Sequence, residues 1–273
     1  MSTSSVIGNP QTLLVNGQLS EALRALSAEV RIQPANAALR VFLFQLLAVL
    51  GDWERAANQL EVAGELDPQN ALMMSIYDVA LRGERQREAV MAGKASPAMY
   101  GEPAVWHTSL LQSLQALRAG KFEQALELRI SAFHAAGTVA GTIDGEPFKW
   151  IADVDPRFGP CLELILETGY AWVPFSQLRS LKFEAPADLR DKVWAPVQIV
   201  WKGGSEAIGF VPCRYPGSDR SGVAGFALAT RTTWIEQATD CFVGRGQRMF
   251  VTDATDYSLL DVRSVTFGEP SAG

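Results

Sequence analysis

A repeat with a period of 34 residues constrains the N-terminal part of the chain more than any other sequence feature. Gly17 and Gly51 are 34 positions apart. Four further pairs of small, apolar or turn-forming residues keep this offset: Ala22 and Ala56, Leu26 and Leu60, Pro34 and Pro68, and Asn36 and Asn70. The period is that of the tetratricopeptide repeat, whose unit is a pair of antiparallel helices. We therefore predict stacked helix pairs, which usually present a curved surface to peptides or helices of partner proteins.

The residue types suit these positions. The two glycines fall where a tight turn between helices favours a residue without a Cβ atom. The two prolines end the second helix of each unit, because proline lacks the N–H that a helix interior needs. A third echo of the repeat follows at Gly120 and Ala125. The charge-rich segment between Ala80 and Gly93 is interpreted as a degenerate unit or a connector.

After about Gly137 the pattern changes from helical spacing to alternation with a period of two, and glycine, proline and tryptophan become frequent. This predicts two domains, residues 1–137 and residues 138–273. Three hairpins are expected in the second domain: one turning at Thr168–Gly169, one turning at Lys202–Ser205, and one joining Arg248–Thr252 to Leu259–Thr266. Short helices are expected at Ser176–Lys182 and Ala187–Val193.

The predicted fold class is an α–α superhelix of tetratricopeptide type followed by a compact α+β domain. The sheet of that second domain is expected to be antiparallel, and the pattern leaves open whether it closes into a barrel. Five tryptophans of the second half are expected in the core, because each buries a large apolar area: Trp150, Trp172, Trp194, Trp201 and Trp234.

Composition excludes several classes of function. The 273-residue chain is 48% hydrophobic and 20% charged, which is typical of a folded globular protein. Its formal net charge is −6, and neither half is basic, so we expect no nucleic-acid partner. Three widely spaced cysteines do not form a disulfide framework and fit a reducing cytosol. The N-terminus resembles no secretory signal, and the longest apolar stretch, Val41–Leu50, is too short to span a bilayer. We therefore predict a cytoplasmic protein without a membrane partner.

Known catalytic motifs are incomplete in this sequence. Gly244-Arg245-Gly246 begins like a dinucleotide-binding fingerprint, but Met249 stands where the third glycine belongs. The two histidines, His107 and His134, lie in the helical half, away from all three cysteines. We expect no bound metal or other cofactor and no catalytic residue.

Two groups of charged and aromatic residues are candidate sites. The first group contains Asp153, Asp155, Arg157, Asp188, Arg190 and Asp191. Ion pairing and turn capping explain these residue types, contact with a partner is an alternative, and paired carboxylates also suit metal binding or acid–base catalysis. The second group contains Arg214, Tyr215, Arg231, Trp234, Gln247 and Arg248. Arginine beside aromatic residues suits both internal packing and protein interfaces.

Six strings in the second half follow one another in a characteristic order. They are FKWIADVDPRFGP (148–160), YAWVPF (170–175), PADLRDKVW (186–194), RYPGS (214–218), RTTW (231–234) and GRGQR (244–248). With the helical repeats ahead of them, they resemble the ImpE/SciE/TagJ family of type VI secretion accessory proteins, and the resemblance covers nearly the whole chain.

The resemblance implies a function for the chain. It implies a non-enzymatic adaptor that binds the small subunit of the contractile sheath through a helix of that subunit. It also implies a link to sheath assembly or recycling, and so indirectly to the sheath-recycling ATPase. The alternative function is a small-ligand or metal-dependent enzyme that uses the carboxylates of Asp153, Asp155, Asp188 and Asp191.

Overall fold

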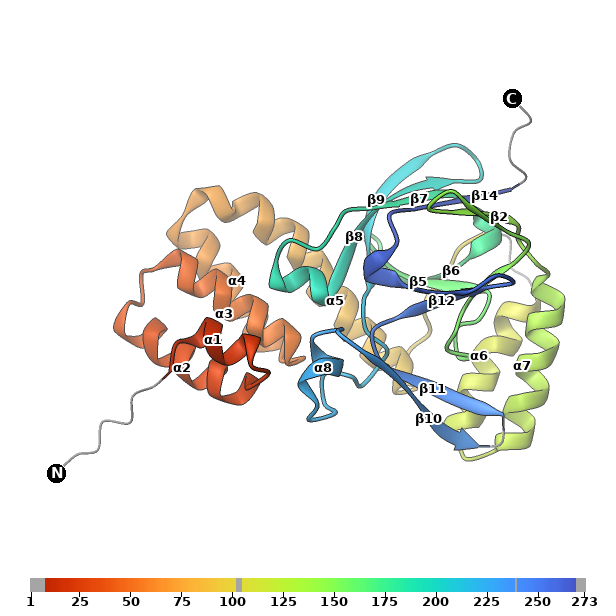
Figure 1. The fold of residues 1–273 in the computed structure, drawn as a ribbon, viewed down its shortest axis with the longest axis horizontal. Helices are drawn as coiled ribbons and strands as arrows, with labels where there is room; N and C mark the ends of the chain where they lie inside the picture. The colour runs from red at the N-terminus through yellow and green to blue at the C-terminus, as the bar shows by residue number, and fades with distance from the viewer. Residues whose placement is uncertain (1–7, 102–104, 239, 269–273) are drawn as a thin grey trace.

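A computed structural model describes residues 8–101, 105–238 and 240–268. Repeat helices lie at one end of the molecule, a β-rich body lies beside them, and a further helix pair packs on the far side of that body (Figure 1). The helices are α1 (Pro10–Val15), α2 (Leu19–Ile32), α3 (Ala37–Val49), α4 (Trp53–Leu66), α5 (Ala71–Met91), α6 (Val105–Arg118), α7 (Phe122–Ala136) and α8 (Ala224–Ala227). Single 3-10 turns occur at η1 (Pro68–Asn70), η2 (Phe175–Gln177), η3 (Leu189–Lys192) and η4 (Leu259–Asp261).

The predicted repeat is confirmed. The turns that join α1 to α2, α3 to α4, and α6 to α7 each contain a glycine with a positive φ, at Gly17 (72°), Gly51 (72°) and Gly120 (70°). The small residues Ala22 and Ala56 are fully buried at the helix contacts. Helices α2 and α4 both end two residues before the proline of their unit. The 34-residue period therefore reports the spacing of helix pairs, as expected.

Two of these glycines predict a measurable difference in stability. A Cβ atom built on Gly51 would lie 2.1 Å from the Asp219 carboxylate, whereas nothing lies within 4 Å of one built on Gly120. Alanine at either position carries the left-handed backbone penalty of about 1–2 kcal/mol. We expect Gly51→Ala to cost about 1 kcal/mol more than Gly120→Ala, because Asp219 must also move. Urea unfolding of both variants measures this difference, and equal losses would contradict the proposed contact.

The charge-rich segment that was interpreted as a degenerate unit or connector is the second half of α5. This helix of 21 residues runs from the repeats onto the β-rich body, where it packs against β5 and β6. Gly83 allows the close approach, since a Cβ atom there would lie 2.4 Å from the side chain of Ile165. The chain then adds strand β1 (Ala98–Met99), which pairs in parallel with β6. Helix α5 and strand β1 both precede residue 137 and both contact the sheet.

The main sheet has nine strands in the order β1-β6-β5-β9-β8-β7-β14-β2-β3, and all pairs except β1–β6 are antiparallel. Its strands after β1 are β2 (Gly141–Ile143), β3 (Glu146–Phe148), β5 (Cys161–Leu166), β6 (Gly169–Pro174), β7 (Leu178–Phe183), β8 (Trp194–Trp201), β9 (Glu206–Pro212) and β14 (Ser264–Phe267). The sheet is not closed: in the described part of the chain its edges are β1 and β3. Two small antiparallel sheets complete the body: β13 (Asp256–Ser258), β12 (Met249–Thr252) and β4 (Ile151–Asp153), and β10 (Thr232–Ala238) with β11 (Cys241–Gly246).

Two of the three predicted hairpins are confirmed, β5–β6 and β8–β9. The third was wrong. Strand β12 pairs with the short β13, whereas β14 crosses to the main sheet and pairs with β7 and β2. The helix expected at Ser176–Lys182 was also wrong, because this segment is mostly strand β7, in which polar residues separate the buried Leu178, Leu181 and Phe183. The helix expected at Ala187–Val193 is the single turn η3.

Candidate functional site

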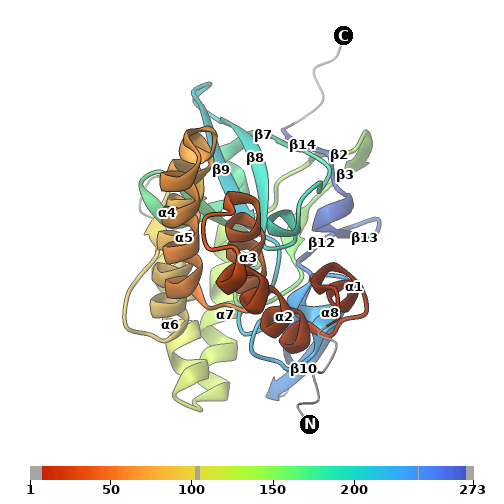
Figure 2. The same cartoon turned by 90° about the vertical axis from the view of Figure 1, so that its left-hand side faces the viewer.

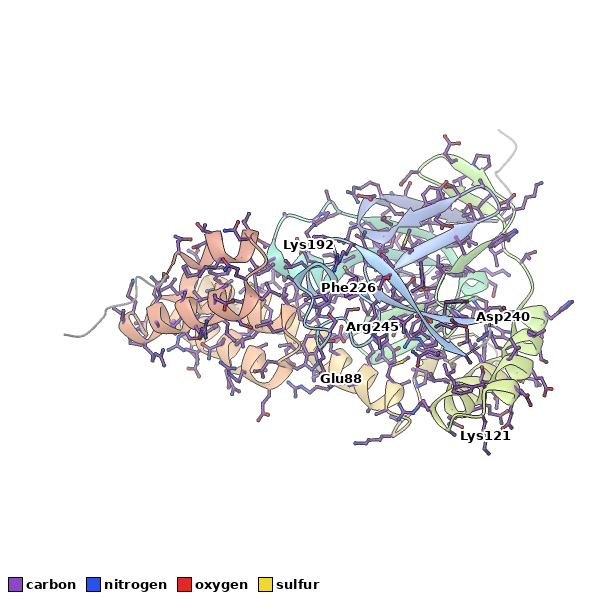
Figure 3. The ribbon with its side chains drawn as sticks, turned by 60° about the horizontal axis from the view of Figure 1, so that its bottom comes forward. Glu88, Lys121, Lys192, Phe226, Asp240 and Arg245 are labelled. Carbon is purple, nitrogen blue, oxygen red and sulfur yellow. The ribbon has the colours of Figure 1, made fainter. Side chains whose placement is uncertain are left out.

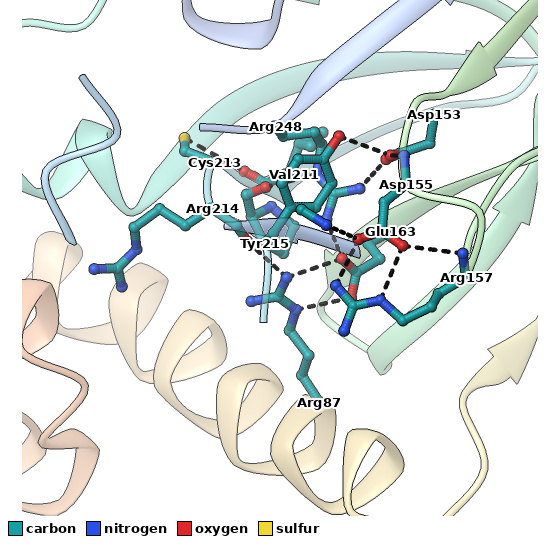
Figure 4. Close-up of polar contacts among 12 residues, drawn as sticks. Arg87, Asp153, Asp155, Arg157, Glu163, Val211, Cys213, Arg214, Tyr215 and Arg248 are labelled. Atoms are coloured by element: carbon teal, nitrogen blue, oxygen red, sulfur yellow. Dashed lines mark hydrogen bonds and ion pairs between the residues drawn. The ribbon is translucent and has the colours of Figure 1, made fainter. Parts of the chain in front are cut away.

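Glu163 is the centre of a buried polar network between α5 and the sheet (Figure 4). It lies on β5, where the side chains of Leu162 and Leu164 join the core on one face of the sheet. Cys161 and Ile165 join the core on the helical face. Glu163 shares their side of the strand, because side chains alternate along a strand. Its side chain is 0% exposed, so it needs polar partners from the protein itself.

Two arginines supply these partners. Arg87 on α5 forms a bidentate pair with Glu163, with N···O distances of 2.7 and 2.9 Å, and also donates to the backbone oxygen of Arg214 at 2.7 Å. Arg248 pairs with the same carboxylate and with Asp153. Tyr170 donates its hydroxyl proton to Glu163 as well. One carboxylate therefore joins a repeat helix to three segments of the β-rich body.

Asp153 and Asp155 extend the network toward β11. The Tyr215 hydroxyl donates to Asp153 at 3.0 Å, and the backbone N–H of Asp155 donates to the same carboxylate at 2.9 Å. Asp155 is fully buried, where it accepts from the Arg157 guanidinium and from the backbone N–H of Gly244 at 2.7 Å. The structure therefore brings together Asp153, Asp155, Arg157, Tyr215 and Arg248 from the two predicted groups.

Burial and neighbouring charges shift the pKa values of Glu163 and Asp153 in opposite directions. Burial alone would raise the pKa of Glu163, but the guanidinium groups of Arg87 and Arg248 outweigh it and lower the pKa to about 2. Asp153 shares only one of those cations, and burial raises its pKa to about 7. Glu163 is therefore the carboxylate that stays charged over the whole physiological range.

The depressed pKa of Glu163 predicts acid destabilisation. Its ordinary pKa is 4.5 and its folded value is about 2. The charged form contributes stability above pH 4.5 that is lost as the pH falls toward 2, and the shift corresponds to about 3 kcal/mol. We expect the free energy of unfolding to decrease across this window, and Glu163→Gln to weaken that decrease. The quantity to compare is the difference in the free energy of unfolding between wild type and variant at each pH. The contributions of the other carboxyl groups largely cancel in this difference, because both proteins contain them. Parallel pH profiles would contradict the prediction.

Arg214 forms a second buried connection, between the repeats and the β-rich body. It is 4% exposed, and its guanidinium donates to the backbone oxygens of Val49 at 2.6 Å and Ala48 at 3.2 Å, at the C-terminus of α3. It also donates to the oxygen of Ala227 in α8 at 2.8 Å. Both helix ends present unpaired carbonyl groups and partial negative charge, which a buried cation satisfies.

The other predicted site residues lie outside this network. Asp191 accepts from the backbone N–H groups of Ala187 and Asp188 at 2.8 Å and so stabilises η3. Arg190 pairs with Asp188 and lies over the ring of Tyr77, 4.8 Å from its centre. No hydrogen bond or ion pair among the described residues joins this turn to Asp153 or Asp155. The four carboxylates of the enzyme alternative therefore do not form one site.

The remaining members of the second group, Arg231, Trp234 and Gln247, lie in the β10–β11 hairpin or directly beside it in the sequence. The guanidinium of Arg231 lies over the ring of Phe226, 4.6 Å from its centre. Trp234 is half-buried against the ring of Tyr215, with 5.5 Å between ring centres. Gln247 pairs through its backbone with Arg214. These contacts are internal packing.

The arrangement is suited to holding two parts of the chain together. Arginines and carboxylates alternate in it, and its central groups, Glu163 and Arg248, are 0% exposed. In the described part of the chain, no group of three or more histidines, cysteines, aspartates or glutamates is placed to hold a metal ion. The thiols of Cys161 and Cys213 are buried, which raises the pKa of both and disfavours the reactive thiolate.

The curved face of the repeats is covered by the chain's own residues. The fully buried ring of Trp194, at the start of β8, lies among Phe44 of α3, Trp53 of α4 and Tyr77 of α5. Phe210 of β9 packs on Tyr77, and η3 packs on α3. Figure 2, seen from the repeat end, shows these helices in front of β8 and β9. A partner helix therefore needs another surface, since this one is already filled.

Fold and contacts together define a class of protein: a tetratricopeptide-like helical repeat fixed to an open antiparallel sheet by a buried ionic network. Comparisons agree with this class. Residues 13–75 match a tetratricopeptide repeat family, and residues 145–266 match the ImpE protein family. No helix in the described ranges is long and apolar enough to cross a membrane.

A curated relative and a solved structure resemble almost the whole chain. The type VI secretion system accessory component TagJ of Pseudomonas aeruginosa is 46% identical over 261 residues, which cover 96% of this chain and 91% of the relative. A crystal structure of a protein from Vibrio parahaemolyticus superposes with a TM-score of 0.88 at 25% identity, covering 96% of this chain and 98% of that one. The chain belongs to the ImpE/TagJ family of type VI secretion accessory proteins.

Proposed function

We propose that this protein is a cytoplasmic, non-enzymatic adaptor that binds the small subunit of the contractile sheath through a helix of that subunit. In this role it links the sheath to assembly or recycling, and so indirectly to the sheath-recycling ATPase. The observation that carries the proposal is the 46% identity over 96% of the chain to a type VI secretion accessory component. Accessory proteins built on helical repeats generally act by binding other proteins.

The internal chemistry supports an adaptor more than an enzyme. Glu163 and Arg248, the central charged groups of the network, have each other as partners and are 0% exposed. An active site needs such groups in a cleft that a substrate can enter. The residues that remain available for binding are therefore those of the molecular surface.

The test is a calorimetric titration of the full-length protein with the purified small sheath subunit of the same bacterium. We expect saturable binding at micromolar concentration, since a single helix docked in a groove buries only a small interface. Synthetic peptides that cover each predicted helix of the subunit then identify the segment. A folded sample that releases no heat with either the subunit or any peptide would rule out the adaptor function.

A further inference from the structure

Strand β10 forms an open edge on the outer side of the β10–β11 hairpin. The two strands make a separate two-stranded sheet, and among the described residues no third strand pairs with β10. Figure 3 places the hairpin at the front of the molecule, with Phe226 and Arg245 near its base and Asp240 at its turn. An open edge presents unpaired backbone N–H and C=O groups, to which another strand can pair.

Hydrogen bonds on the far side of β11 show which groups of β10 face this open edge. The backbone N–H groups of Gly244 and Gly246 donate away from β10, to side chains of other segments, at 2.7 and 2.8 Å. These glycines lie opposite Trp234 and Thr232. Opposite residues of an antiparallel pair alternate between bonding each other and both facing outward. Thr232, Trp234 and, two residues further, Glu236 therefore direct their N–H and C=O groups to the open edge.

The other open edges of the described sheets are short, whereas β10 is long and unprotected. Strand β1 has two residues, and β3, β4 and β13 have three each, with Pro147 in the middle of β3. Strand β10 has seven residues, and its regular stretch Thr232–Glu236 contains no proline, glycine or lysine. The irregularity in its pairing falls only after Glu236. Short strands, proline, lysine and bulges are the devices that keep an edge from pairing, so this stretch is suited to pairing.

The stretch complements itself about a two-fold axis. When two copies pair in antiparallel fashion with Trp234 opposite Trp234, each Glu236 lies opposite the hydroxyl group of Thr232, and no like charges are opposite each other. A register centred on Glu236 would instead place two carboxylates opposite each other, which destabilises a sheet. The register centred on Trp234 also places Thr233 opposite Ile235, whose side chain is 39% exposed. Both residues are β-branched and so favour a sheet.

We infer that β10 pairs with β10 of a second copy of this chain, so that two molecules share an antiparallel four-stranded sheet. Such an interface closes on itself, as in the commonest protein dimers. A pair of short strands buries less area than a standard protein interface, so the dimer dissociates on dilution. The inference goes beyond the proposed function, because dimerisation requires no sheath subunit. A dimer carries every partner-binding surface twice, which strengthens attachment to a partner that is present in many copies.

Light scattering of the full-length protein over a dilution series tests the dimer. We expect the wild type to approach twice the chain mass of 29.7 kDa at high concentration. Glu236→Pro removes an N–H group that faces the open edge and leaves the bonds to β11 in place, and we expect it to raise the dissociation constant at least tenfold. Glu236→Gln is the matched control, because it removes the charge and keeps the N–H group. We expect it to dimerise within threefold of wild type.

A pair of charges tests the register. Ile235→Lys brings two ammonium groups to diagonal positions across the interface, and Thr233→Glu brings two carboxylates to diagonal positions. We expect each single substitution to weaken the dimer at least fivefold. The double variant places each new ammonium group opposite a new carboxylate of the second copy, so its dissociation constant should return to within threefold of wild type. Thermal melts check that all variants fold.

Three outcomes would overturn the inference: a wild type that is monomeric at every concentration, a dimer that Glu236→Pro leaves unchanged, or a double variant as weak as the single ones. A fourth concerns another occupant. If the wild type is monomeric and Glu236→Pro abolishes its binding of the purified small sheath subunit, the edge belongs to that partner. The titration with the subunit is a separate measurement, so the proposed function stands if dimerisation fails.

Discussion

Replacing Glu163 with glutamine is expected to lower the free energy of unfolding by about 3–5 kcal/mol. The substitution keeps the size of the side chain but removes the only charge that Arg87 and Arg248 share. Both guanidinium groups would remain buried. Arg248 would keep its ion pair with Asp153, whereas Arg87 would keep a longer ion pair with Glu84, at 3.4 Å, and its hydrogen bond to the backbone oxygen of Arg214. Uncompensated buried charge is among the largest single contributions to instability that one substitution produces.

Glu167→Gln is the matched control for this prediction. Glu163 and Glu167 flank the same apolar run at the end of β5, but Glu167 is exposed to solvent. We expect its substitution to change the free energy of unfolding by less than about 0.5 kcal/mol. Urea unfolding followed by circular dichroism measures both variants. Similar small losses for the two variants would show that the ionic network does not hold α5 against the sheet.

The same pair of residues explains what sequence analysis can and cannot predict. Both glutamates fit the polar positions of a strand in which apolar and polar residues alternate. The contrary signal was Ile165, which breaks the alternation because β5 is apolar on both faces. A strand buried on both faces turns an ordinary polar position into a buried charge, and only the tertiary structure shows which partners compensate it.

The sequence correctly predicted features that depend on residues close to one another along the chain. The turn glycines, the prolines and two hairpins follow from residues within a few positions of one another. Strand β14 was misassigned because its partner, β7, lies about 80 residues earlier, and no turn chemistry records that pairing. The charge-rich end of α5 was similarly ambiguous. Its buried side, with Ala80, Glu84, Arg87 and Val90, does have helical spacing, but its charged members resemble a solvated face.

For the candidate sites, the sequence identified several of the residues but did not predict which of them lie together. The sequence pointed to Asp153, Asp155 and Arg157 because carboxylates and arginine cluster there, and to Arg214 and Arg248 because these arginines stand near aromatic residues. It did not include Glu163, Glu84 or Arg87. It also joined Asp188 and Asp191 to carboxylates that belong to a different part of the fold. Distances in space between segments far apart in sequence decide such groupings.

Replacing Trp194 with alanine is expected to cost about 3–5 kcal/mol and to loosen the repeats from the sheet. The indole is fully buried among aromatic rings of α3, α4 and α5, with centre-to-centre distances of 5.8–6.4 Å. Its N–H donates to the buried Glu84 at 3.1 Å, so the variant also leaves that carboxyl group without this donor. Hydrogen exchange should increase in α3 and in the first half of α5 before it increases in β5 and β6.

Trp150→Ala is the control, since that tryptophan is 36% exposed and its loss leaves no comparable cavity. We expect it to cost less than half as much. Trp194→Phe, which keeps a ring in the cavity, supplies a milder version of the change if the alanine variant does not fold.

The binding titration then separates two roles for the repeats. Because Trp194→Phe keeps an aromatic ring between the repeats and the sheet, binding of the sheath subunit should survive in this variant. A loss of binding in this variant, with α7 and β10 still protected from exchange, would instead place the partner on the repeats.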